Sequence, residues 1–185
     1  MAEHLCPVWV GYFLANPLRK LAQHPYRLLS PYLKPGMTAL DIGCAMGFFT
    51  IPMIKMVQPG GRIIAVDIQA EMIEKLHKKL RKNNFNGYIE TRICSEDSFS
   101  IDDLQKQVDF VLLFDVLHEI PQPIIALKEI SVVLKQGGIL FFVEPKGHVK
   151  EDAFKTALDM ADKEGLLLQS LLKINYSHAA LLVKQ

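Results

Sequence analysis

The stretch TALDIGCAMGFFTIP, residues 38–52, decides the fold of this 185-residue chain. It begins apolar, turns through Gly43 and Gly47, and continues into an apolar segment of helical character. A strand, a tight glycine loop and a helix N-terminus together are how α/β proteins hold a nucleotide-like ligand. We expect Gly43 to turn the chain at positive φ and Gly47 to let the backbone approach a ligand closely. Asp41, just before the loop, would repel a pyrophosphate but suits a ligand with an amino group.

The spacing of this motif differs from that of a dinucleotide-binding fingerprint. It reads acid, any residue, glycine, three residues, glycine, so the third glycine of G-x-G-x-x-G is absent. A glycine pair between two apolar runs can also be a purely structural turn. The motif therefore needs support from the rest of the chain.

Composition narrows the class of protein. Half of the residues are apolar and the formal net charge is +1, which indicates a folded domain with no basic excess for nucleic acid. The cysteines, Cys6, Cys44 and Cys94, are widely spaced and odd in number, so we expect neither disulfides nor a metal site, and a cytoplasmic location. No apolar run approaches the roughly 20 residues of a membrane span, and we recognise no secretion signal.

The remaining pattern predicts an α/β fold with a doubly wound, mostly parallel seven-stranded sheet. We expect strands over residues 37–42, 62–66, 88–94, 108–114, 139–144, 166–174 and 179–183, with helices over 47–57, 69–84, 124–134 and 150–163. We expect the glycines of residues 135–138 to end the third of these helices. Only residues 175–178 join the last two strands, and a parallel return needs about a dozen residues, so these strands form a C-terminal antiparallel hairpin.

Residues 1–36 precede the glycine loop, and we interpret residues 1–185 as a single domain whose core is 37–185. Asn16-Pro17 is typical of a helix start, and a second short helix is expected before the turn at residues 34–36. The earliest part carries the only tryptophan, Trp9, with further aromatic residues. This segment is either a helical cover on the sheet or a lid over the ligand pocket.

Polar residues follow the predicted strands where a ligand would lie. Asp67 closes the second strand, at the place where nucleotide folds hydrogen-bond a ribose diol, although an aspartate there can also cap the next helix. Ser95 and Glu96 follow the third strand, and Asp115 follows the fourth. His118 comes next. The unperturbed pKa of a histidine, about 6.5, suits a general base, although His118 can equally cap a helix or bond the backbone.

These motifs together resemble class I S-adenosylmethionine (SAM) dependent methyltransferases. The resemblance rests on DIGCAMG at 41–47, Asp67, SED at 95–97, DVLHEIP at 115–121 and the terminal hairpin, with Ala45 where the family usually has its middle glycine. We expect Ala45 to tighten the loop but keep its backbone donors available. The resemblance implies SAM as cofactor, bound in part by the glycine loop. It assigns the SAM ribose to Asp67 and the face of the adenine to Ile68. It assigns the exocyclic amine of the adenine to Ser95 and Glu96, and the methionine end of SAM to Phe114 and Asp115. The residues implied at the glycine loop are Asp41, Gly43, Cys44, Ala45 and Gly47.

The predicted function is therefore SAM-dependent methyl transfer to a small-molecule acceptor, with His118 as the candidate base and with neither nucleic acid nor membrane as partner. No inserted substrate domain separates the strands, so we expect the N-terminal segment to roof the pocket. Glu144, at the end of the fifth strand, is expected to face the same crevice. Two other functions stay open: a non-catalytic SAM-binding module and a nicotinamide-dependent oxidoreductase. The acceptor and the oligomeric state are not specified by the sequence.

Overall fold

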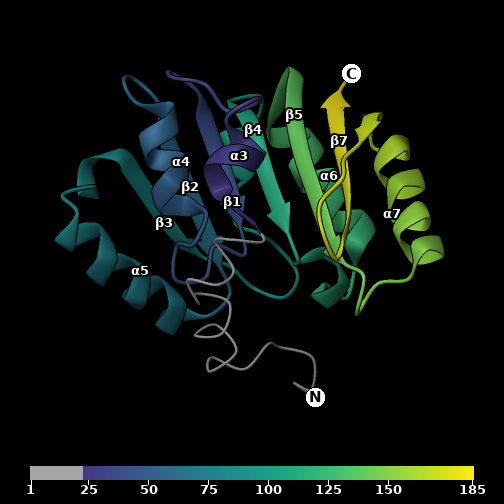
Figure 1. The fold of residues 1–185 in the computed structure, drawn as a ribbon, viewed down its shortest axis with the longest axis horizontal. Coiled ribbons are helices and arrows are strands. Elements are labelled where there is room, and N and C mark those ends of the chain that lie inside the picture. Colours follow the sequence, from purple (N-terminus) through teal and green to yellow (C-terminus); the bar gives the residue numbers. More distant parts are fainter. Residues whose placement is uncertain (1–22) are drawn as a thin grey trace.

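A seven-stranded sheet in the order β3-β2-β1-β4-β5-β7-β6 forms the centre of the structure (Figure 1). The structure is a computed structural model and describes residues 23–185. The strands are β1 (Thr38–Ile42), β2 (Arg62–Asp67), β3 (Ile89–Ile93), β4 (Val108–Phe114), β5 (Leu134–Pro145), β6 (Leu166–Leu171) and β7 (Ser177–Lys184). The helices are α3 (Pro25–Leu29), α4 (Thr50–Val57), α5 (Ala70–Lys82), α6 (Pro123–Val133) and α7 (Glu151–Lys163), with short 3-10 turns η1 (Asn86–Tyr88), η2 (Asp102–Leu104) and η3 (Leu117–Glu119).

The order of the strands reverses between β1 and β4. The chain builds β1, β2 and β3 toward one edge and then returns to place β4 beside β1, and all of these pairs are parallel. β5 continues in parallel beside β4, whereas β7 runs antiparallel between β5 and β6. The predicted α/β fold and its antiparallel C-terminal hairpin are thus confirmed, and the switch point lies where ligands bind in open α/β sheets.

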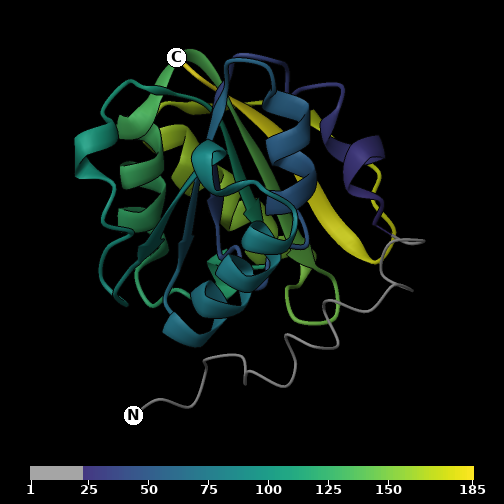
Figure 2. The same ribbon diagram turned by 90° about the vertical axis from the view of Figure 1, so that its left-hand side faces the viewer.

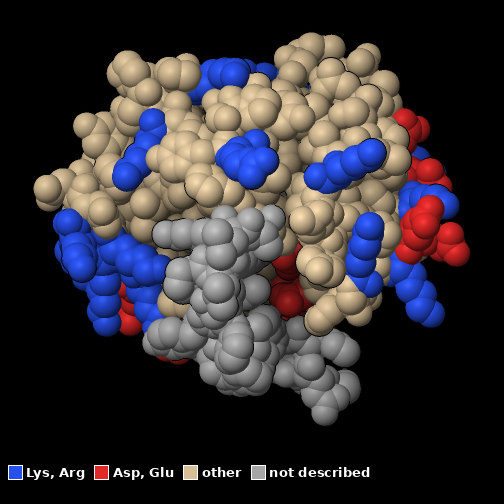
Figure 3. Space-filling view, viewed as in Figure 1, with Lys and Arg blue, Asp and Glu red and all other residues tan. Residues whose placement is uncertain are grey.

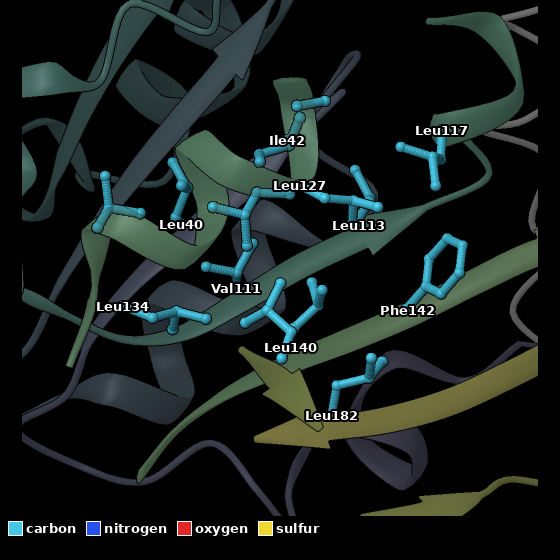
Figure 4. Close-up of a cluster of buried hydrophobic side chains, with 14 of the residues drawn as sticks. Leu40, Ile42, Val111, Leu113, Leu117, Leu127, Leu134, Leu140, Phe142 and Leu182 are labelled. Carbon is cyan, nitrogen blue, oxygen red and sulfur yellow. The ribbon is translucent and has the colours of Figure 1, made fainter. Parts of the chain in front are cut away.

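Helices cover both faces of the sheet, with α3 and α4 on one side and α6 on the other (Figure 2). Successive strand residues point to opposite faces, so the central strands contribute to two apolar clusters, one on each face. Figure 4 shows the cluster on the α6 side, where Leu127 of α6 lies over Val111 and Leu140 of the central strands. The cluster on the opposite face packs side chains of α3, α4 and α5 against Phe110 of β4 and Phe141 of β5. Burial on both faces explains why β4 is apolar at nearly every position.

The N-terminal segment is described from residue 23 onward. Pro25 occupies the first turn of α3, where its missing N–H sacrifices no hydrogen bond, and Leu29 and Leu33 are buried in the cluster shared with α4. The interpretation of residues 1–36 as a cover or a lid stays a prediction. The predicted helix start at Asn16-Pro17 and the aromatic group around Trp9 lie outside the described residues.

Two predicted boundaries were wrong for identifiable reasons. The helix expected from Gly47 begins only at Thr50, because the chain from residue 45 is still turning. The glycines at 137 and 138 do not cap α6: they lie inside β5, where the pairing with β4 shifts register between Val108 and Phe110.

Lysine and arginine side chains gather over α5, at the left of Figure 3. Lys75 forms an ion pair with Glu71 at 2.6 Å, and Lys79 donates to the carbonyl of Met46 at 2.8 Å. The opposite side of the same helix buries Met72, Ile73, Leu76 and Leu80. The basic residues therefore belong to the solvent side of an amphipathic helix.

Candidate active site

A cavity of about 420 Å³ lies at the carboxyl ends of the parallel strands, where the segments after β1, β2 and β4 meet. Its volume falls within the usual range for small-molecule sites. All of the predicted site residues line it except Gly47; they are Asp41, Gly43, Cys44, Ala45, Asp67, Ile68, Ser95, Glu96, Phe114, Asp115 and His118. None of residues 23–36 is among the lining residues, so the described part of the N-terminal segment does not roof the cavity.

Asp41 is the most deeply buried acid of the cavity. It lies in β1, is 3% exposed, and its Oδ2 accepts a hydrogen bond of 2.6 Å from the Thr50 hydroxyl at the start of α4. Burial raises its pKa to about 7; the bond from Thr50 opposes this rise and the charge of Asp67 adds to it. Asp41 therefore changes charge near neutrality. The sequence analysis did not identify Thr50, although a hydroxyl residue after a glycine loop is a recognisable partner for such an acid.

The glycine loop is held tightly by its own hydrogen bonds. Gly43 has φ +72°, and a Cβ there would lie 2.4 Å from Val116 Cγ2, so both its conformation and its surroundings require glycine. The Gly43 and Cys44 amides both donate to the Val66 carbonyl, and the Ala45 amide donates to Asp67 Oδ2 at 2.8 Å. The expectation that Ala45 leaves the loop's donors available to a ligand was therefore wrong for these three amides. Ala45 itself adopts φ +44°, which is unusual for a residue with a Cβ.

Gly47 has a structural rather than a ligand-facing position. It is not among the residues that line the cavity, and its φ is +82°. A Cβ at this position would lie 2.5 Å from Leu76 Cδ1 of α5. The close approach that we predicted for Gly47 is therefore to a neighbouring helix, which explains the glycine without a ligand.

Asp67 ends β2 with both carboxylate oxygens engaged. Oδ2 accepts the Ala45 amide and Oδ1 accepts the Gln69 amide at 2.9 Å, so the side chain ties the glycine loop to the start of α5. Burial raises its pKa, and the two amide bonds oppose that rise. A carboxylate offers about four lone-pair positions, so two remain for further donors. Ile68 follows directly and also lines the cavity.

One wall of the cavity is the segment after β3. The Ser95 amide donates to the Ser98 carbonyl at 3.0 Å, and the Phe99 amide donates to Glu129 Oε2 of α6 at 2.9 Å. Glu129 of α6 thus anchors this wall directly. The sequence analysis missed Glu129; its signal is the helical spacing from Gln122 through Ile125 and Ala126, all of which line the cavity.

The end of β4 changes direction sharply. Phe114 packs against Phe49, with ring centroids 4.5 Å apart. Asp115 follows at φ +58°, and its amide donates to the Val143 carbonyl at 2.9 Å. This left-handed residue turns the chain out of the sheet and directs residues 116–118 along the cavity.

His118 is held by a buried acid. Its Nδ1 lies 2.6 Å from Glu144 Oε2, and this bond raises the pKa of His118 even though partial burial opposes the rise. Glu144 is 2% exposed, and its Oε1 accepts the Leu117 amide at 2.9 Å. Glu144 is not among the described residues that line the cavity, so the expectation that it faces the crevice was wrong. It lies behind His118.

The two cysteines of the cavity are protonated thiols. Burial raises the pKa of Cys44 well above its usual value and raises that of Cys94 to about 11. Neither is therefore activated as a nucleophile at neutral pH. Among residues 23–185, no group of His, Cys, Asp or Glu side chains is arranged to hold a metal ion. Cys6 lies outside this part of the chain.

The charge of the cavity is strongly one-sided. Within the described chain its lining includes no lysine or arginine, whereas it includes the acids Asp41, Asp67, Glu96, Asp97, Asp115, Glu119 and Glu129. Burial also raises the pKa of Glu119. Such a lining favours a positively charged ligand and disfavours an anionic one.

Within residues 23–185, none of the helices has the length and apolar character that crossing a bilayer requires.

The fold and the acid-lined cavity at the switch point define a SAM-dependent methyltransferase fold. A crystal structure of a SAM-dependent methyltransferase from Aquifex aeolicus shares this fold with a TM-score of 0.86 at 23% identity, covering 97% of this chain and 100% of that one. Residues 33–175 match the methyltransferase domain family. The chain belongs to this family, and SAM is its cofactor, as the sequence motifs predicted.

Two curated relatives are similar to part of this chain. A demethylmenaquinone methyltransferase of Staphylococcus carnosus is 32% identical over 115 residues, which are 62% of this chain and 46% of that protein. A demethylmenaquinone methyltransferase of Lactobacillus johnsonii is 31% identical over 112 residues, which are 60% of this chain and 45% of that protein. The matched region thus spans slightly less than half of each relative. Family membership leaves the nicotinamide-dependent oxidoreductase without support.

Proposed function

We propose that this protein transfers the methyl group of SAM to an uncharged small molecule that carries an ionisable hydroxyl, of the quinol type. The observation that carries the proposal is His118, a cavity residue whose Nδ1 is bonded to the buried Glu144 at 2.6 Å. The relatives from S. carnosus and L. johnsonii, named for demethylmenaquinone, support a quinone-type acceptor.

The residues of the cavity fit SAM by their chemistry. A cationic sulfonium and an α-amino group suit a lining that is rich in carboxylates and, in the described chain, without lysine or arginine. Asp67 would bind the ribose diol through its two remaining lone-pair positions, and Asp41 would hold the amino group. Ile68, Ser95 and Glu96 would surround the adenine. When bound, SAM supplies an electrophilic methyl group on its sulfonium.

The lining also restricts the acceptor. A phosphate or carboxylate on the acceptor would meet seven acidic side chains and no described cation. Phe48, Phe49, Ile120 and Ile125 instead offer apolar contact to an aromatic ring. An uncharged aromatic hydroxyl is therefore the chemistry that the described walls accept best.

His118 would take the proton of the acceptor hydroxyl, so that oxygen or the ring carbon conjugated with it becomes the nucleophile. Neutral imidazole is required for this role. Because the bond to Glu144 raises the pKa of His118, activity rises with pH as His118 loses its proton, at a pH above the ordinary value of 6.5. The cavity positions the two reactants, which can supply much of the rate enhancement.

Methyl transfer to 1,4-dihydroxynaphthalene, a quinol probe, tests this proposal with labelled SAM. We expect turnover with the purified protein and a loss of about 10²- to 10⁴-fold in kcat for His118→Ala, with S-adenosylhomocysteine binding retained by calorimetry. Lys155→Ala, an exposed change on α7, is the control. Full activity of His118→Ala would refute the role of His118 as general base. Binding of S-adenosylhomocysteine without turnover on any quinol would favour the non-catalytic SAM-binding module.

A further inference from the structure

Glu144 is a buried acid behind the candidate base His118. It lies near the end of β5, which is flanked by β4 and β7, and is paired with His178 of β7. Its exposure is 2%, and no lysine or arginine of the described chain forms an ion pair with it. Burying a carboxylate is costly unless its oxygens are satisfied, so the partners of this side chain need to account for it.

Both oxygens of Glu144 are committed to one short segment after β4. Oε1 accepts the Leu117 amide at 2.9 Å, which fixes the backbone of η3, and Oε2 lies 2.6 Å from His118 Nδ1. A carboxylate can only accept, so Nδ1 carries the hydrogen of this bond. Because His118 lines the cavity and Glu144 does not, the ring lies between the buried acid and the cavity, with its Nδ1 bonded to the acid.

We infer that Glu144 is the positioning residue of His118: it selects the Nδ1–H form of the imidazole and leaves Nε2 to accept a proton from the acceptor. The inference rests on the proposed function. The same carboxylate holds the backbone of η3 and the His118 ring, so it fixes both the position and the orientation of the imidazole. Glu144 acts through His118 and touches no reacting atom.

The groups around His118 are consistent with this arrangement. Glu119 of the same turn and Asp115 at the end of β4 add negative charge that favours the protonated ring. His148, which follows β5, lies edge-on to His118 with ring centroids 5.6 Å apart. Only Glu144 forms a direct bond to a ring nitrogen of His118 among the described hydrogen bonds, so it is the residue that sets the tautomer.

Nitrogen-15 spectra of the histidine rings, recorded against pH on the ligand-free protein, test the inference directly. In the parent protein we expect neutral His118 to carry its hydrogen on Nδ1 and to titrate above 6.5. Glu144→Gln keeps an acceptor for Leu117 but removes the charge, so the midpoint should fall to 6.5 or below and the Nε2–H form should appear. Asp109→Asn, at the opposite end of β4, removes an acid that does not contact His118 and should leave the titration unchanged.

Kinetics with 1,4-dihydroxynaphthalene provide the second readout. We expect Glu144→Gln to lower kcat about tenfold with KM nearly unchanged, and to move the acid limb of the pH profile to lower pH. Glu144→Asp, which keeps the charge, should recover part of the lost rate. An unchanged His118 titration in Glu144→Gln, or an Nε2–H tautomer in the parent protein, overturns the inference. The tautomer of His118 in the parent protein tests the inference even if the Glu144→Gln variant does not fold.

The two proposals fail in different ways. If the parent protein turns over the quinol but Glu144→Gln shows parent-like titration and kinetics, the inference is overturned and the proposed function stands. If His118 titrates as expected but no quinol is methylated, the proposed function fails and with it the catalytic use of the pair.

Discussion

Asp41→Asn should make the protein more stable, and increasingly so as the pH rises. The carboxyl of Asp41 keeps its proton in the folded protein up to about pH 7, whereas it ionises near 3.8 in the unfolded chain. Its contribution to stability is therefore fully present below pH 3.8 and is lost as the pH rises to about 7. Asparagine has the same shape, cannot ionise, and can still accept the hydrogen bond from Thr50.

The magnitude follows from the separation of the two pKa values. At about 1.4 kcal/mol per pH unit, the ionised side chain costs the fold about 4 kcal/mol above pH 8. At pH 5 only the unfolded chain is largely ionised, and the gain of the variant falls to about 2 kcal/mol. For a chain of this length, about 4 kcal/mol corresponds to roughly 10 °C in Tm.

Urea unfolding of both proteins at pH 5 and pH 8.5 measures this difference. Asp109→Asn is the matched control: Asp109 forms an ion pair with Lys135 at 2.6 Å, so its removal should not stabilise. A gain for Asp41→Asn that is equal at both pH values, or a loss at pH 8.5, would refute the reasoning. The same variant should bind S-adenosylhomocysteine more weakly, because an amide cannot match the charge of an amino group.

Two more variants probe the segments around the cavity. Ala45→Gly should raise the free energy of unfolding by about 0.5–1 kcal/mol in urea, because relief of the left-handed conformation at φ +44° outweighs the extra freedom of glycine in the unfolded chain; a destabilised variant would contradict this. S-adenosylhomocysteine at a hundredfold excess over its Kd should raise the Tm of the parent protein by about 5–10 °C. Asp67→Ala should abolish this rise, whereas Glu74→Ala, at an exposed position of α5, should keep it. NAD and ATP should give no comparable rise in the parent, and an unchanged rise in Asp67→Ala would remove the ribose assignment.

The parts of the site that could be predicted depend on residues that are close together in the sequence. Asp41 and Asp67 lie at the carboxyl ends of apolar strands, and the ends of neighbouring parallel strands meet at one edge, so their convergence on the cavity follows from strand assignment alone. The antiparallel C-terminal hairpin followed in the same way from a short connection.

The parts that could not be predicted depend on contacts between distant segments. Glu129 reaches the Phe99 amide 30 residues away, and Glu144 reaches His118 26 residues away. The helical spacing places Glu129 on the cavity side of its helix, but no local pattern identifies the partner of either acid. Gly47 was misinterpreted for a related reason: the sequence indicates that a Cβ is unfavourable there, but only the packing of Leu76 identifies the neighbour. The glycines of β5 were assigned to a helix end because a bulge in a strand and a helix stop share the same signal.

The position of β7 bears on how the chain folds during synthesis. In the described chain β6 joins the sheet only through β7, and β7 is the later of the two to leave the ribosome. When Leu171 has emerged, the parallel strands can already assemble, but β6 still lacks its partner and the open edge of β5 is unprotected. Residues 177–184 then pair with β5 on one side and with β6 on the other, which closes that edge. A nascent chain stalled before this point would expose the side of β5 that is most prone to pair with another molecule.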